Sequence, residues 1–154
     1  MKPEDFLSPH FRLAEFLHNG SMEGVTTDVI LNLRKLANIL ELIREVFGKP
    51  IIITSGFRTI LHNAQIKGSA KGSQHLYGLA ADFRIEGLSP KFIQAKLAQL
   101  KDKIGFCLEI TNGDWTHIDL RPEHIVFENL GGGKYKTLNV VEIKDFVRKY
   151  GVAA

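Results

Sequence analysis

Two histidines and an aspartate in the middle of the chain have a spacing that could bind a metal ion. His75 and Asp82 are seven residues apart with Gly78 between them, and His117 follows within Trp115–Asp119. One carboxylate and two imidazoles are ligands that zinc accepts, and they leave one coordination position open. A catalytic zinc needs that position for a water whose pKa it lowers, whereas a structural site closes all four. The pattern therefore predicts a catalytic metal site.

The backbone must turn between the first two ligands. In one unbroken helix His75 and Asp82 would lie about 10 Å apart along the axis, too far for ligands that each approach within about 2 Å of one ion. Gly78 can supply the turn because glycine adopts backbone conformations that other residues avoid. Residues 80–85 then read as a short strand that carries Asp82 inward.

The third ligand lies in a segment of alternating residues. Trp115, His117 and Asp119 alternate with Thr116, Ile118 and Leu120, so on a strand the first three share one face. His117 is therefore the natural partner of the other two ligands.

The surrounding pattern predicts an α+β fold. An apolar stripe at helical spacing begins after Thr26 and ends before Gly48 and Pro50, which predicts a long core helix. Four more elements are expected: a buried strand at 51–54, a helix from the cap Ser89 and Pro90 to Leu100, a hairpin of 104–110 with 115–120 around Asn112-Gly113, and a terminal helix at 140–150.

Several motifs occur together and in a fixed order: Ser55-Gly56-Phe57-Arg58, Asn63, Ser73-Gln74-His75 with Gly78 and Asp82, and Trp115-Thr116-His117-Ile118. In this combination they resemble the D-Ala-D-Ala carboxypeptidase family of zinc peptidases, which shares its fold with the hedgehog signalling domain and includes phage endolysins. The likeness is closest to the small, single-domain phage and bacterial branch and covers about Leu7 to Leu120. It implies a small, mainly antiparallel sheet that carries the metal site and packs against the long helix and further helices.

The resemblance also implies a function. We expect Zn²⁺ as the cofactor and peptidoglycan as the substrate, with hydrolysis of an amide bond in stem peptides or cross-links, next to a D-amino acid. Carboxypeptidase and endopeptidase activities both stay open, and a phage lysin or a virion component would fit. The alternative is a non-catalytic, hedgehog-like zinc domain that binds cell wall or a protein, although an open ligand position and a nearby acid argue against it.

Four residues outside the ligand set are candidates for substrate contact. Arg58 follows the predicted strand, and a fixed guanidinium can bind a carboxylate, a carbonyl or the oxyanion formed from it. Ser73 and Gln74 are expected to contact substrate by resemblance, although both could simply cap the turn. Trp115 is either part of the core or a wall of the cleft, and the two roles are not exclusive.

Two acidic residues compete as the catalytic base. A zinc hydrolase needs a carboxylate that takes a proton from the attacking water and passes it to the leaving amine. Asp114 lies three residues before His117, where some members of the wider group carry their base. Glu109 matches the small phage-like branch, but two more residues than usual separate it from His117.

The hairpin register decides between them. With a two-residue turn at Asn112-Gly113, Leu108 would oppose His117 and Asp114 would be favoured. With a three-residue turn, Glu109 would sit opposite His117 on the metal side. Asp114 has a ready role as a turn former, whereas Glu109 in an apolar strand has none. We therefore predict Glu109.

Composition sets the remaining expectations. The 154 residues suit one domain over 1–154, with a strand, a turn and a helix in 121–154. The net charge of +3 is small, so no nucleic-acid partner is expected, nor a membrane partner, since no apolar run approaches a span. Residues 1–10 lack the apolar core of a secretory signal. We expect a monomer made in the cytoplasm without a signal peptide, which acts on the cell wall after release or delivery.

Overall fold

The computed structural model describes residues 1–152 and contains helices on a mixed sheet. Its elements in chain order are β1 (Phe6–Ser8), β2 (Phe11–Arg12), η1 (Leu13–Phe16), η2 (His18–Gly20), α1 (Thr27–Phe47), β3 (Ile52–Ser55), α2 (Ile60–Gln65), η3 (Gln74–Tyr77), β4 (Ala80–Arg84), α3 (Pro90–Ala98), η4 (Lys101–Gly105), β5 (Cys107–Ile110), β6 (Thr116–Asp119), β7 (Val126–Gly131), β8 (Lys134–Thr137) and α4 (Val140–Tyr150). The predicted α+β class is confirmed.

Six strands form the main sheet in the order β3-β4-β6-β5-β7-β8. Neighbouring strands run antiparallel except for β5 and β7, which are parallel. The sheet is thus mainly antiparallel, as expected. The neighbouring strands β4 and β6 pair Asp82 directly with His117, so the sheet itself brings two predicted metal ligands together.

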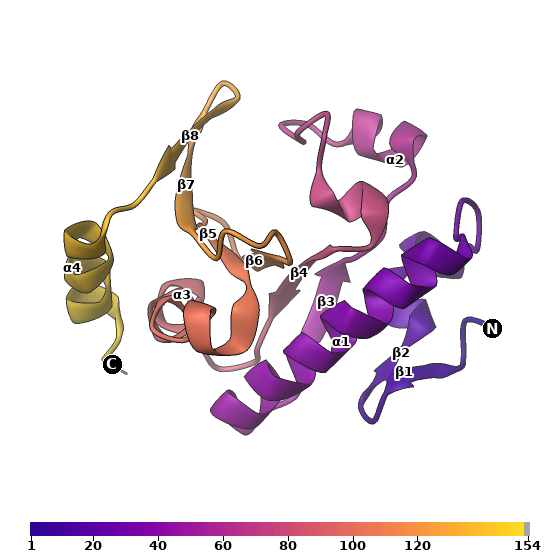
Figure 1. Cartoon of the computed structure of the whole chain (residues 1–154), viewed down its shortest axis with the longest axis horizontal. Helices are drawn as coiled ribbons and strands as arrows, with labels where there is room; N and C mark the ends of the chain where they lie inside the picture. Colours follow the sequence, from indigo (N-terminus) through magenta and orange to yellow (C-terminus); the bar gives the residue numbers. More distant parts are fainter. Residues whose placement is uncertain (153–154) are drawn as a thin grey trace.

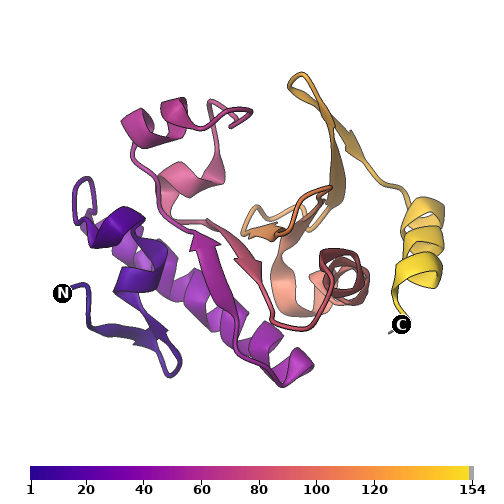
Figure 2. The same ribbon diagram turned by 180° about the vertical axis from the view of Figure 1, so that it is seen from behind.

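The long helix α1 begins and ends where the sequence predicts. The Thr26 hydroxyl accepts a hydrogen bond from the Val29 amide at 3.2 Å, and Gly48 closes the helix in a left-handed conformation with φ 63°. Its buried face includes Leu36 and Leu40, which are fully inaccessible to solvent. Figures 1 and 2 show α1 lying across β3 and β4, which it supports from one side.

Two predictions about strands are wrong, one about burial and one about a boundary. The strand expected at 51–54 is β3, but it forms the edge of the sheet, so Ile52 and Ile53 are only half-buried and Thr54 is exposed. The strand expected from Ile104 begins at Cys107, because α3 ends at Ala98 and a short π-helical segment, η4, follows it.

The C-terminal part forms an arm and a helix. The glycine run at 131–133 connects β7 to β8, and the hairpin stands out from the sheet (Figure 1). Helix α4 matches the predicted bounds and packs Ile143, Phe146 and Val147 against the core. Within residues 1–152, no helix combines the length and apolar character needed to cross a membrane.

Candidate metal centre and catalytic cleft

The three predicted ligands lie together. His75, Asp82 and His117 each offer a ligand atom, and these atoms are all within 4.8 Å of one another. His75 comes from η3, Asp82 from β4 and His117 from β6. All three are shielded from solvent, with side chains between 3% and 13% exposed. The turn that makes this possible is at Gly78, which has φ 72° and ends η3.

Gly78 has a second constraint besides its backbone angle. A side chain there would bring a Cβ to 3.1 Å from both the Leu33 side chain and the Val29 carbonyl of α1. The turn between the first two ligands is therefore packed directly on the long helix. Helix α1 thus positions the metal centre although it contributes no ligand.

His75 is held in one orientation by the backbone. Its Nδ1 lies 2.6 Å from the Gly56 carbonyl, which can only accept a hydrogen bond, so Nδ1 carries the proton. Burial lowers the pKa of His75, which favours the neutral ring. Nε2 then has a free lone pair and points at Asp82 Oδ1, 3.3 Å away. Metal-bound histidines commonly have this arrangement, with the second nitrogen fixed by a carbonyl or carboxylate.

Asp82 is shared between the histidines and Arg58. Its Oδ1 lies 2.7 Å from His117 Nδ1, and its Oδ2 accepts a hydrogen bond from Arg58 NH2 at 3.3 Å. Burial alone would raise the pKa of Asp82, but the two histidines more than compensate and hold it well below its usual range. The carboxylate is therefore ionised and available as a ligand.

Arg58 is nearly buried and its guanidinium makes three hydrogen bonds. Besides Asp82, it donates to Ser55 Oγ at 3.0 Å and to Asn63 Oδ1 at 3.3 Å. The structure thus gives Arg58 a role that the sequence did not predict, which is to orient Asp82. It also lines the cleft. Since a guanidinium has five N–H donors, capacity remains for the predicted contact with substrate.

His117 has a second carboxylate behind it. Its Nε2 lies 3.2 Å from Asp119 Oδ2, and Asp119 is only 1% exposed. Arg121 donates to both oxygens of Asp119, at 2.8 and 2.9 Å. Burial opposes protonation of His117, yet the hydrogen bonds to Asp119 and Asp82 raise its pKa to about 10. At neutral pH both ring nitrogens of His117 therefore carry protons, with Nε2 donating to Asp119 and Nδ1 donating to Asp82. A metal ion would bind at Nδ1 by displacing its proton, while Asp119 keeps the proton on Nε2.

These residues fit a zinc ion. Two tetrahedral ligands, each about 2.0 Å from an ion, are roughly 3.3 Å from each other. The distance from His75 Nε2 to Asp82 Oδ1 is 3.3 Å, whereas His117 Nδ1 is hydrogen-bonded to the same oxygen at 2.7 Å and would have to move outward to admit an ion. The lining of the cleft carries three carboxylates, of Asp82, Glu109 and Asp119, and three cationic side chains, of Arg58, Lys67 and Arg121. A two-nitrogen, one-oxygen donor set suits a divalent cation such as zinc and leaves one position open.

The hairpin register places Glu109 beside the centre. Glu109 pairs with His117 and Leu108 with Ile118, which is the register of the three-residue turn. Burial raises the pKa of Glu109 above its ordinary value, against the lowering effect of His117, as suits a base that works near neutral pH. Asp114 is exposed and lies outside the lining of the cleft. The role of Glu109 as base stays a prediction, now with a suitable position.

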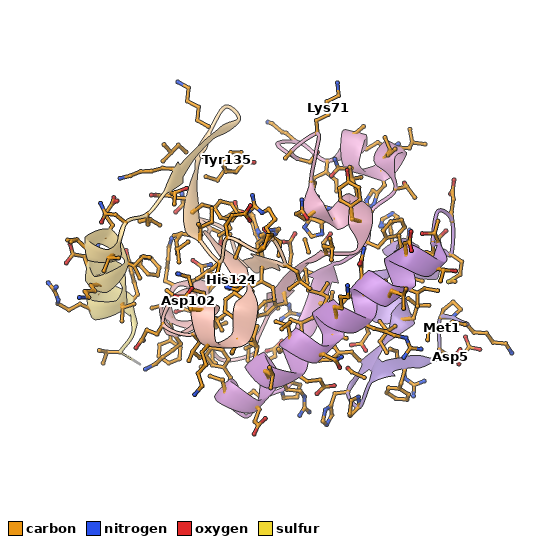
Figure 3. The ribbon with its side chains drawn as sticks, in the orientation of Figure 1. Met1, Asp5, Lys71, Asp102, His124 and Tyr135 are labelled. Atoms are coloured by element: carbon orange, nitrogen blue, oxygen red, sulfur yellow. The ribbon has the colours of Figure 1, made fainter. Side chains whose placement is uncertain are left out.

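A cleft of about 430 Å³ opens over the centre between two arms. One wall is the loop at 66–73, and the other is the β7–β8 hairpin, which contributes Phe127, Asn129, Tyr135 and Thr137. Figure 3 labels Tyr135 on the hairpin and Lys71 on the facing loop. This hairpin wall was not predicted, since only a strand, a turn and a helix were expected in residues 121–154.

The predicted substrate-contact residues all line this cleft. Ser73 caps η3 by accepting a hydrogen bond from the His75 amide at 3.2 Å, and Gln74 lies next to it. Trp115 is 41% exposed, so it belongs to the wall of the cleft and not to the core. Contact of these residues with substrate stays a prediction.

Asp119, Arg121 and Asn129 were missed as site residues. The alternation in 115–119 already placed Asp119 on the face of His117, so the signal for Asp119 and its partner Arg121 was present. Asn129 had no local signal. It reaches the cleft because β7 pairs in parallel with β5, a long-range contact.

Two comparisons with known proteins bear on this site. A family model described as Peptidase M15 matches residues 9–119. The matched range runs from β2 to the end of β6 and includes all three candidate ligands, Arg58 and Glu109. It agrees with the extent expected from the motifs, and the β7–β8 arm and α4 lie outside it. A search among curated proteins gives no significant match.

Proposed function

The chain belongs to the M15 family of zinc D-Ala-D-Ala carboxypeptidase-type peptidases, and from this premise we propose that it hydrolyses an amide bond in peptidoglycan. The bond lies in stem peptides or their cross-links, next to a D-amino acid. One observation supports the proposal above all. A buried His-Asp-His cluster, an acidic side chain of raised pKa and a fixed guanidinium line one open cleft.

The chemistry follows from the position of each group. Zinc, when bound by His75, Asp82 and His117, would polarise the scissile carbonyl and make an attacking water more acidic. Glu109 takes a proton from that water as its oxygen bonds to the carbonyl carbon. It then gives the proton to the nitrogen as the C–N bond breaks. Arg58 holds Asp82 in place and stabilises negative charge on the substrate.

The proposal also covers the fold type, the oligomeric state and the place of action. A fold of the hedgehog/DD-peptidase type, with a sheet that supports the ligands from β4 and β6, fits this activity. We propose that the protein is monomeric and acts on the cell wall after release or delivery, as a phage lysin would. The cleft carries both signs of charge, which suits a peptide with carboxylate and amine groups.

The proposal is tested by metal removal and restoration. Purified protein should contain close to one zinc per chain and release new amino termini from peptidoglycan stem peptides. Chelation should abolish the activity and added zinc should restore it. If the zinc-loaded protein binds sacculi but releases no product from any stem peptide, it is a non-catalytic binding domain and the proposal fails.

A further inference from the structure

A second cavity adjoins the cleft at Glu109. It measures about 480 Å³ and lies between the turn at 111–113 and the end of β7 at 129–131. Three residues line both cavities: Glu109, Trp115 and Asn129. The second cavity is therefore a continuation of the cleft past the candidate base, and not a separate depression elsewhere on the surface.

The turn that forms one wall is held from beneath by a buried side chain. Gln94 of α3 is fully buried, and its amide donates to Thr111 Oγ1 at 2.8 Å and to the Trp115 carbonyl at 3.3 Å. Its carbonyl accepts from the Thr111 amide at 3.3 Å. Both ends of the turn are thus fixed to α3, so the wall is formed before any ligand arrives.

This wall presents an aromatic surface. The Trp115 ring lies against Gly113 so closely that a Cβ on Gly113 would be 1.7 Å from Trp115 Cζ3. Trp115 is 41% exposed, and Leu130 on the opposite wall is 57% exposed. Two large apolar side chains therefore remain open to solvent on either side of a cavity that continues the cleft. Such surface is commonly used for binding.

The wall formed by β7 borders Glu109, since Asn129 and Glu109 line the same two cavities. Asn129 Oδ1 accepts a hydrogen bond from the Gly131 amide at 2.9 Å, which leaves the Asn129 amide nitrogen as a donor. Burial raises the pKa of Glu109, and the neighbouring Asn129 side chain lowers it to a lesser extent. A substrate that fills the second cavity would therefore lie against the candidate base and the Asn129 side chain beside it.

The position of the candidate base indicates which half of the substrate the second cavity would bind. Glu109 must deliver its proton to the leaving amine, so the leaving half of the substrate lies on the Glu109 side of the metal centre. We infer that the second cavity binds this leaving half and that the enzyme cuts internal bonds, as an endopeptidase does. Release of a single terminal D-Ala would leave the cavity empty. This inference rests on the proposed function and specifies its substrate class.

The test compares two bonds in defined muropeptides. The zinc-loaded protein is given a stem pentapeptide that ends in D-Ala-D-Ala and the cross-linked dimer made from the same stems. Products are identified by mass spectrometry. We expect internal cleavage with a kcat/KM at least about tenfold above that for release of free D-Ala. Release of D-Ala at an equal or higher rate would overturn the inference and leave the zinc peptidase intact. Absence of any cleavage would overturn the proposed function itself.

Two variants test the cavity directly. Leu130→Arg places a charge in its apolar wall, and Gly113→Ala displaces the Trp115 ring. Both should raise KM for internal cleavage about fivefold to tenfold, with kcat and zinc content little changed. Leu61→Arg is the matched control, because Leu61 is 71% exposed on α2 and lines neither cavity. If both variants keep the KM of the unchanged protein, the cavity does not bind substrate.

Discussion

The metal centre and the second cavity are built in opposite ways, although they share a border. In the centre the polar side chains are buried and bonded to one another, with Asp82 bridging His117 and Arg58. In the cavity the two large exposed side chains, Trp115 and Leu130, are apolar, and the order comes from the backbone of a turn that Gln94 holds. The buried polar network of the metal centre holds the catalytic groups in one arrangement. The exposed apolar surface of the second cavity determines which substrates reach the metal centre.

This contrast predicts how the two regions respond to mutation. A buried network loses much when one member is removed, because its partners are left with unpaired polar groups. An exposed apolar wall loses only contact area with its ligand. Changes in the metal centre should therefore affect metal content and turnover, whereas changes in the cavity should affect substrate selectivity.

The largest effect is expected from the ligands themselves. His75→Ala or His117→Ala should reduce the zinc content sharply and abolish turnover, because two remaining ligands hold the ion poorly. Zinc is measured by atomic spectroscopy after dialysis, and circular dichroism checks the fold. His124→Ala is a suitable control, since His124 lies outside the cluster. A His75→Ala variant that keeps full zinc would remove this residue from the site.

Substitutions of the two candidate bases should change turnover without changing zinc content. Glu109→Gln should keep zinc and fold but lower kcat by about 10² to 10⁴-fold, the usual contribution of a general base. Asp114→Asn changes the other candidate base, which is exposed in the turn of the same hairpin, and should lower kcat only slightly. Kinetics on a single stem peptide decides between them. The opposite result, with Asp114→Asn inactive and Glu109→Gln active, would exclude Glu109 as the base.

A smaller effect is expected behind His117. Asp119→Asn removes the charge that holds Nε2–H and should weaken zinc affinity by about 10 to 100-fold, the usual cost of losing such a partner. Competition with a chromogenic chelator measures the affinity without any substrate. Asp145→Asn, in an exposed ion pair with Arg148, serves as the control. Equal affinities for the two variants would show that Asp119 does not support the centre.

The smallest effect should come from Arg58. Arg58→Lys keeps the charge but cannot bond to Ser55, Asn63 and Asp82 at once, so turnover should fall about tenfold with the fold retained. Arg84→Lys replaces a more exposed arginine on β4 and should change nothing. Unchanged turnover in Arg58→Lys would mean that the planar geometry of the guanidinium is not needed.

The sequence predicted the elements that carry local signals. Thr26 and Gly48 define α1 through capping, and Gly78 defines the turn before Asp82 through its backbone conformation. The register of the β5–β6 hairpin also followed from local reasoning, because Glu109 is out of place in an apolar strand unless it faces a site. Capping, turns and alternation act within a few residues, so a sequence shows them directly.

The parts that were not predicted depend on distant contacts. Residues 126–131 become a strand by pairing with β5, and this pairing brings Asn129 into the cleft. The exposure of β3 depends on its place at the sheet edge, which its β-branched residues do not indicate. Gln94 lies within a helix whose other buried residues are mainly apolar, and nothing in the local pattern connects it with Thr111.

The chain has a single tryptophan, and it stands where the two cavities meet. Because Trp115 is partly exposed and held by a fixed turn, its intrinsic fluorescence reports the surroundings of the site without interference from another indole. A ligand that covers the ring should shift the emission to shorter wavelength. The protein therefore contains its own optical probe, and occupancy of the site can be followed in real time without a label.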